Sequence, residues 1–212
     1  MITDDNFTIL IPARKGSKGL PFKNRKLFKY TADIIPDKLI KDTYISTDDD
    51  FFKPLSLQYG FNFHKRDPEH AKDESTSKEF VLDFLSKSKD YLITLYLTYP
   101  ERTWSDVELA ISFFNNKNSQ SLLCKKEISV SPYLMMYELD NSKGEQVIRH
   151  NLCRRQDYRP CFEISHFISI INKKYAYNLN NNLYNKKTDF MLINDVVDID
   201  KEADLERFNE KG

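Results

Sequence analysis

Short apolar runs alternate with amphipathic stretches along the first 125 residues of the chain. Runs rich in apolar and β-branched residues predict strands near 7–11, 43–46, 61–64, 91–97 and 121–124. Between them, apolar positions recur at helical spacing behind the capping boxes Thr76–Glu79 and Ser105–Glu108. This alternation implies crossovers between parallel strands, and therefore an α/β fold with a doubly wound, mostly parallel sheet.

The pattern changes after residue 128. Extended runs at 133–139 and 145–150 flank a turn sequence at 140–144, which predicts a β-hairpin. We expect one domain over residues 1–212, with a small hairpin extension over 128–160. Further strands are predicted at 167–172 and 189–193, and a last helix near Asp200.

Length, charge and cysteine content narrow the class of protein. The 212 residues carry 32 basic and 32 acidic side chains, and this balance argues against a general nucleic-acid-binding protein. No apolar run approaches the ~18 residues of a membrane span, and the acidic N-terminus lacks the apolar core of a signal peptide. The three cysteines, Cys124, Cys153 and Cys161, have no CxxC spacing, which favours reduced thiols in a cytoplasm.

The loop after the first strand combines glycines with several cationic side chains. Pro12 ends the strand because it has no amide hydrogen to donate, and two of the five glycines, Gly16 and Gly19, follow. Four cations surround them: Arg14, Lys15, Lys18 and Lys23. Exposed amides beside cations suit a polyanion such as a triphosphate. An ordinary solvated turn is the alternative, and the spacing matches neither a P-loop nor GxGxxG.

The full string from Ile11 to Gly19, followed by Lys23 and Asn24, resembles the signature of the CMP-sugar cytidylyltransferases of the acylneuraminate and nonulosonate type. These enzymes activate sialic acid and related acidic sugars with CTP. Further similar stretches follow in the family's order, at 45–49, 65–77, 98–103, 155–160 and 197–204. The resemblance covers most of the chain and implies a Rossmann-like sheet of the nucleotide-diphospho-sugar transferase type.

The resemblance also implies roles for individual residues. The nucleotide is expected to contact Pro12, Ala13, Arg14, Gly16, Ser17, Lys23, Asn24, Arg66, Asp73 and Ser77. The acid acceptor is expected to contact Tyr96, Thr98, Arg102, Arg155, Gln156 and His166. The expected catalytic residues are Arg14, Lys23, Asp198 and Asp200, with Mg²⁺ as the cofactor on the two aspartates.

Two groups of acidic residues allow more than one role. Asp198 and Asp200 occupy alternate positions, which point the same way in an extended chain and suit oxygen ligation of a hard cation. Either could instead cap the last helix. The acids at 48–50 follow a predicted strand, where helix capping is favoured over metal binding.

The chain departs from the family pattern mainly on the acceptor side. Tyr96 and Leu97 stand where Gln-Pro is common, and residues 165–167 read Ser-His-Phe where Asn-Gly-Ala is expected. The segment 24–46 is also shorter than is usual in the family. The nucleotide side therefore matches the family, whereas the acceptor is left open.

The resemblance implies transfer of CMP from CTP to an acidic, sialic-acid-like nonulosonic sugar, with release of pyrophosphate, for surface glycan biosynthesis. It also implies a homodimer formed through the extension, with neither nucleic acid nor membrane as a partner. One alternative is a Kdo-like acid, or a non-sugar acid or phosphate, as the acceptor. Another is a non-catalytic CTP-binding partner subunit, against which the presence of both Asp198 and Asp200 argues.

Overall fold

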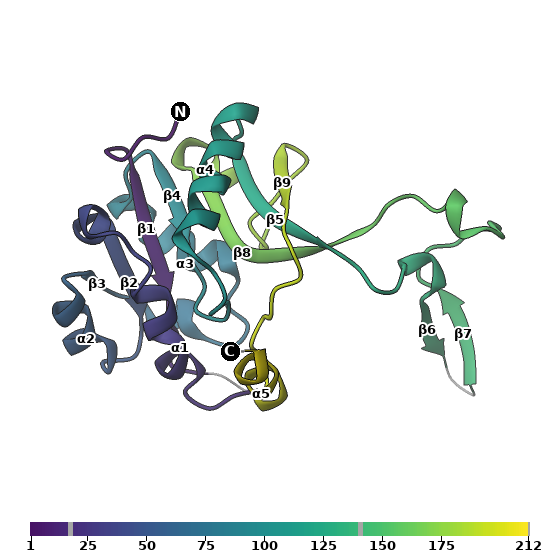
Figure 1. Ribbon diagram of the computed structural model, residues 1–212, viewed down its shortest axis with the longest axis horizontal. Helices are drawn as coiled ribbons and strands as arrows, with labels where there is room; N and C mark the ends of the chain where they lie inside the picture. The colour runs from purple at the N-terminus through teal and green to yellow at the C-terminus, as the bar shows by residue number, and fades with distance from the viewer. Residues whose placement is uncertain (17–18, 140–141, 212) are drawn as a thin grey trace.

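The computed structural model describes residues 1–16, 19–139 and 142–211. Its main sheet has seven strands in the order β3-β2-β1-β4-β8-β5-β9 (Figure 1). The strands are β1 (Phe7–Pro12), β2 (Thr43–Thr47), β3 (Asn62–Lys65), β4 (Tyr91–Thr94), β5 (Ser121–Glu127), β8 (Phe162–Asn172) and β9 (Thr188–Leu192). Only β8 runs antiparallel to its neighbours in this sheet of described residues. The predicted mostly parallel α/β fold is confirmed, and the reversed strand was not foreseen.

The central strand β1 explains why the sheet is covered on both faces. All six of its residues are buried, and successive side chains of a strand point to opposite faces. Ile9 and Ile11 accordingly pack into the larger core cluster, whereas Leu10 packs into a second cluster with Phe84 and Leu92. A continuous apolar run is what a strand buried on both faces requires.

The described residues form five α-helices: α1 (Lys23–Ala32), α2 (Phe52–Tyr59), α3 (Ser77–Phe84), α4 (Trp104–Lys117) and α5 (Glu202–Lys211). The capping box predicted at Thr76 and Glu79 begins α3. The box of α4 is formed by Thr103 and Asp106, so the prediction at Ser105 was two residues late. Thr103 has the extended backbone of an N-cap, and its hydroxyl accepts the amide of Asp106.

The expected hairpin is present as β6 (Met136–Leu139) and β7 (Lys143–Gln146), which pair with each other and not with the main sheet. Figure 1 shows it standing away from the sheet, beyond two long segments that continue β5 and precede β8. The turn residues Asp140 and Asn141 lie outside the described residues. Several large apolar side chains of this extension are exposed, among them Leu134, Met135, Met136, Tyr137 and Leu139.

The last part of the chain returns to the carboxyl end of the central strands. The amide of Ile199 donates to the carbonyl of Thr98 at 2.9 Å, which joins the segment after β9 to the segment after β4. Phe208 of α5 then packs edge-on against Tyr30 of α1. No helix in the described part of the chain is long and apolar enough to cross a membrane.

Candidate active site

A cavity of about 320 Å³ opens beyond the carboxyl ends of β1 and β4, where ligands bind in doubly wound sheets. Twelve of the residues expected in the site line it: Pro12, Arg14, Lys23, Asn24, Arg66, Asp73, Ser77, Tyr96, Thr98, His166, Asp198 and Asp200. A larger hollow of about 680 Å³ lies between α4 and the segment after β9, but no lysine, arginine or histidine lines it. The smaller cavity is therefore the one suited to a polyanion.

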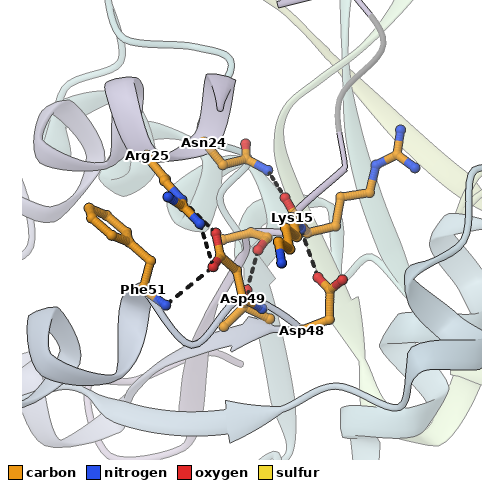
Figure 2. Close-up of polar contacts among 9 residues, drawn as sticks. Lys15, Asn24, Arg25, Asp48, Asp49 and Phe51 are labelled. Carbon is orange, nitrogen blue, oxygen red and sulfur yellow. Dashed lines mark hydrogen bonds and ion pairs between the residues drawn. The ribbon is translucent and has the colours of Figure 1, made fainter. Parts of the chain in front are cut away.

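Hydrogen bonds from two neighbouring elements hold the backbone of the loop after β1 (Figure 2). The side-chain amide of Asn24, on α1, donates to the carbonyl of Arg14 at 2.8 Å. The carboxylate of Asp48, after β2, accepts the amide of Lys15 at 2.7 Å, and the hydroxyl of Thr47 donates to the carbonyl of Ala13. Protein groups thus hold the backbone of residues 13–15 in place. Asn24 contributes by holding the backbone of the loop as well as by lining the cavity.

The acidic residues Asp48 and Asp49, after β2, form hydrogen bonds that stabilise the fold. Asp49 is buried, and both of its oxygens accept hydrogen bonds from the guanidinium of Arg25 on α1, at 2.7 and 2.8 Å (Figure 2). It also accepts the amide of Phe51 just before α2. Burial alone would raise the pKa of Asp49, but these hydrogen bonds outweigh it and the pKa is lowered. Asp49 and Asp48 therefore already have partners that a metal ion would have to displace.

Two cationic side chains of the cavity form ion pairs with acidic side chains. Arg14 pairs with Asp73 at 2.7 Å, and Lys23 pairs with Asp200 at 2.5 Å. Arg66 is buried, stacks over the ring of Phe80 and donates to the carbonyl of Ser46. Its burial lowers its pKa to about 10, so it stays charged at neutral pH. A bound polyanion would compete with Asp73 and Asp200 for their cations.

Asp198 and Asp200 both line the cavity, as their alternate spacing predicts. Burial raises the pKa of Asp198, and hydrogen bonds from Thr98 and Tyr99 oppose that rise. The carboxylate that accepts the amides at the start of α5 belongs to Asp204, which takes those of Asp200 and Lys201. The two aspartates are thus left facing the cavity, and capping falls to Asp204.

This donor set fits a hard divalent cation that shares its ligands with a substrate. No group of three or more His, Cys, Asp or Glu side chains among the described residues could hold a metal ion by itself. Mg²⁺ commonly takes one or two carboxylates and completes its shell with water and phosphate oxygens. Two carboxylates facing a cation-lined cavity meet that requirement.

Aromatic side chains form the other side of the cavity. The hydroxyls of Tyr96 and Ser77 lie 2.9 Å apart, and the Tyr96 ring contacts both Phe80 and His166. Burial raises the pKa of Tyr96 to about 12 and lowers that of His166. The Nδ1 atom of His166 is buried with no hydrogen-bond partner in the described structure. Tyr96 thus links the residues expected at the nucleotide to those expected at the acceptor.

Arg102, which was expected to contact the acceptor, is buried and does not line this cavity. Its side chain is 2 % exposed, and its guanidinium donates to the carbonyls of Phe167 and Tyr96 and to the hydroxyl of Thr31. A buried charge without hydrogen-bond partners is unfavourable, and these three acceptors reduce the cost of burying the guanidinium. Arg102 supports the cavity from beneath.

Other expected residues also lie outside the cavity lining. Arg155 and Gln156 form a short exposed turn on the extension and do not line the cavity of their own chain. Ala13 is buried beneath the loop, and Gly16 does not line the cavity. Ser17 lies outside the described residues. Six further lining residues had been given no site role from the sequence, although Leu97 was noted as a departure on the acceptor side: His70, Lys72, Ser75, Phe80, Leu97 and Tyr99.

A doubly wound sheet with a cation-lined cavity at its carboxyl edge defines the class of nucleotide-binding α/β proteins. The cytidylyltransferase family model matches residues 8–207, so the chain belongs to that family.

Relatives of known name agree with this membership. An N-acylneuraminate cytidylyltransferase of Streptococcus agalactiae is 28% identical over 177 residues, covering 78% of this chain and 43% of that protein. The chain thus spans less than half the length of this relative. A post-translational flagellin modification protein B of Campylobacter coli and a CMP-N,N'-diacetyllegionaminic acid synthase of Campylobacter jejuni are each 28% identical, covering 92% of this chain and 90% of theirs.

Solved structures share the fold at low sequence identity. A CMP:2-keto-3-deoxy-manno-octonic acid synthetase complexed with CTP has a TM-score of 0.68 at 15% identity, covering 96% of this chain and 97% of that one. A 4-diphosphocytidyl-2C-methyl-D-erythritol synthase of Anaerococcus prevotii has a TM-score of 0.58 at 12% identity, covering 96% of each chain. The sheet and helices are therefore those of nucleotide-diphospho-sugar transferases.

Proposed function

We propose that this protein transfers CMP from CTP to an acidic, sialic-acid-like nonulosonic sugar and releases pyrophosphate, in the synthesis of a surface glycan. The observation that carries the proposal is the single cavity in which the cationic loop residues Arg14 and Lys23 meet Asp198 and Asp200. Family membership and the names of the relatives support it.

In this reaction a hydroxyl of the acceptor attacks the α-phosphorus of CTP. A new oxygen–phosphorus bond forms, the bond to the β-phosphate oxygen breaks, and the hydroxyl proton is lost to solvent. Such transfers depend on positioning and charge neutralisation rather than on a covalent enzyme intermediate. Arg14 and Lys23 supply positive charge to the phosphates once Asp73 and Asp200 release them.

Asp198 and Asp200 are the residues that would hold Mg²⁺. When bound, the ion neutralises phosphate charge and orients the triphosphate. A cation bound to Asp200 would compete with Lys23 for that carboxylate, because the two side chains are paired in the structure. Lys23 would then be free to contact a phosphate. Binding of the ion and of the nucleotide would therefore favour each other through this ion pair.

We further propose a homodimer that forms through the extension. Three large apolar side chains exposed on the single short strand β6 support this, namely Met136, Tyr137 and Leu139, because exposed apolar surface commonly marks a protein–protein contact. Arg155 and Gln156, on the same extension, would then contact an acceptor in the cavity of a second copy. Met136→Asp together with Leu139→Asp is expected to yield monomers in sedimentation experiments.

A cytoplasmic setting is part of the proposal, since Cys124, Cys153 and Cys161 are all free thiols. The expected small-molecule partners are CTP and the acidic acceptor, with neither nucleic acid nor a membrane surface.

Thermal unfolding in the presence of different nucleotides tests whether the protein prefers CTP. CTP at about 100 times its dissociation constant should stabilise the protein by about 2.7 kcal/mol, and ATP, GTP and UTP at the same concentration should stabilise it less. Equal stabilisation by all four would contradict the assignment to CTP.

Charge removal tests the metal ligands. Asp198→Asn and Asp200→Asn should each abolish most activity while the protein stays folded, because asparagine lacks the charge that Mg²⁺ prefers. Asp204→Asn is the matched control, since Asp204 does not line the cavity and asparagine keeps an oxygen that can accept the amides of Asp200 and Lys201. Near-normal turnover in the first two variants would place the metal elsewhere.

A further inference from the structure

Tyr99 lies between the cavity and the core, and its hydroxyl contacts one of the two cavity aspartates. It follows β4 in the irregular segment that ends at Arg102, and only 4 % of it is exposed. Its hydroxyl donates to Oδ2 of Asp198 at 2.8 Å. Tyr99 also lines the cavity, yet nothing in the sequence singled it out.

Contacts on every side fix the ring and the hydroxyl of Tyr99. The ring packs edge-on against Phe167, with the centroids 5.6 Å apart and the planes at 89°. The hydroxyl of Ser165 donates to the Tyr99 oxygen at 3.4 Å, which leaves the phenolic proton for Asp198. The bond from the Ile199 amide to the Thr98 carbonyl sets the two chain segments beside each other.

The direction of this hydrogen bond follows from the surroundings of the phenol. A tyrosine phenol carries its proton at neutral pH, and the Ser165 hydroxyl already donates to its oxygen. The phenol therefore acts as a donor to Asp198 rather than as a base. A carboxylate that accepts from a fixed donor is held in one orientation, and such outer partners commonly tune metal ligands.

We propose that Tyr99 is a positioning residue of this site, which holds the Asp198 carboxylate in the orientation that receives the divalent cation accompanying the nucleotide. This inference rests on the proposed function, because it takes Asp198 as a ligand of that cation. It adds a residue to the site that acts through Asp198.

The test compares Tyr99→Phe with the unaltered protein by titrating Mn²⁺ in the presence of a non-hydrolysable CTP analogue, with bound Mn²⁺ measured by electron paramagnetic resonance. Phenylalanine keeps the ring against Phe167 and removes only the hydroxyl. We expect Mn²⁺ affinity to fall about 10-fold or more, within the range seen when an outer partner of a metal ligand is lost. Unchanged affinity would overturn the proposal.

Tyr59→Phe is the matched control, because the Tyr59 hydroxyl also donates to an aspartate, Asp33, at 2.9 Å but outside the cavity. Thermal unfolding monitors the fold of both variants. Steady-state kinetics gives a second readout: Tyr99→Phe should raise the Mg²⁺ concentration needed for half-maximal rate and recover most of kcat at saturating Mg²⁺. A loss of kcat that Mg²⁺ does not relieve would assign Tyr99 a merely structural role.

A double-mutant cycle separates this inference from the proposed function. Tyr99→Phe should have little further effect on Mn²⁺ affinity in an Asp198→Asn background, because the two residues act as one unit. Full loss in Asp198→Asn with none in Tyr99→Phe would overturn only the role of Tyr99. Unchanged Mn²⁺ affinity in Asp198→Asn would overturn both the metal site and this inference.

Discussion

The close packing of Gly19 against Asp200 leads to a sharp prediction for Gly19→Ala. A Cβ atom at Gly19 would lie 2.2 Å from the carbonyl oxygen of Asp200, whereas ordinary van der Waals contact begins at 3.4 Å. The obstacle is backbone, so a side chain cannot move aside to relieve it. The loop, the Asp200 segment or both must therefore shift by roughly 1 Å in total.

Two magnitudes follow from that shift. Overpacking of this kind costs about 1–3 kcal/mol, which for a chain of this size lowers Tm by roughly 2–4 °C per kcal/mol. The same shift separates Lys23 from Asp200, which now lie 2.5 Å apart. Misplacement by about 1 Å in an active site reduces turnover by about 100-fold.

Gly16→Ala is the control for stability, since a Cβ at Gly16 meets no atom within 4 Å. Differential scanning calorimetry of the nucleotide-free proteins should show a lower Tm for Gly19→Ala and an unchanged Tm for Gly16→Ala. Pyrophosphate release should then fall in Gly19→Ala at every Mg²⁺ concentration. Wild-type Tm and turnover in Gly19→Ala would show that the loop does not press against Asp200.

Three further substitutions test other parts of the structure. Arg102→Met should lower the free energy of unfolding by about 1–3 kcal/mol or more in urea titrations, because it leaves the buried carbonyls of Phe167 and Tyr96 without their donor; an unchanged free energy of unfolding would contradict its buried role. Arg14→Lys should reduce turnover about 100-fold with a modest loss of CTP binding, since lysine lacks the forked donor geometry; equal losses of both would count against a role in the transition state. Burial lowers the pKa of His64, so the unfolded chain binds a proton near pH 6.5 that the folded protein does not. Stability should therefore decline as pH falls from about 7 to 5, and this decline should flatten in His64→Gln.

The periodicity of apolar residues in the sequence was sufficient to predict most of the strands and helices. The strand predicted at 43–46 is β2 with one more residue, and the glycine stop expected at Gly60 ends α2 with a φ of 72°. The strand predicted at 91–97 ends at Thr94. The residues that follow are no longer paired as a strand, and Tyr96 and Tyr99 among them line the cavity. Alternation could not reveal that β8 is antiparallel, since strand direction depends on the connection and not on side-chain pattern.

The candidate site was predictable where chemistry is local. The loop after β1 was recognised from its glycines, its cations and the family resemblance, and Asp198 and Asp200 from their alternate positions together with that resemblance. Arg14, Lys23 and both aspartates line one cavity. The burial of Arg102 could not be predicted from the sequence, because one of its acceptors, the carbonyl of Phe167, is 65 residues away along the chain. Tyr99 was missed for the same reason, since its significance lies in a contact with Asp198 across 99 positions.

The most direct measurement is pyrophosphate release from CTP and Mg²⁺ with a panel of acids: N-acetylneuraminic acid, a legionaminic-type acid, a Kdo-type acid and a non-sugar acid. We expect release with CTP and a nonulosonic acid, and slower release with N-acetylneuraminic acid, because the altered segment 165–167 places the bulky side chain of His166 in the lining of the cavity. Release that vanishes with a chelator and does not occur with ATP would support the proposal. Binding of CTP with no release of its pyrophosphate in the presence of any of these acids would contradict it and identify a non-catalytic CTP-binding protein.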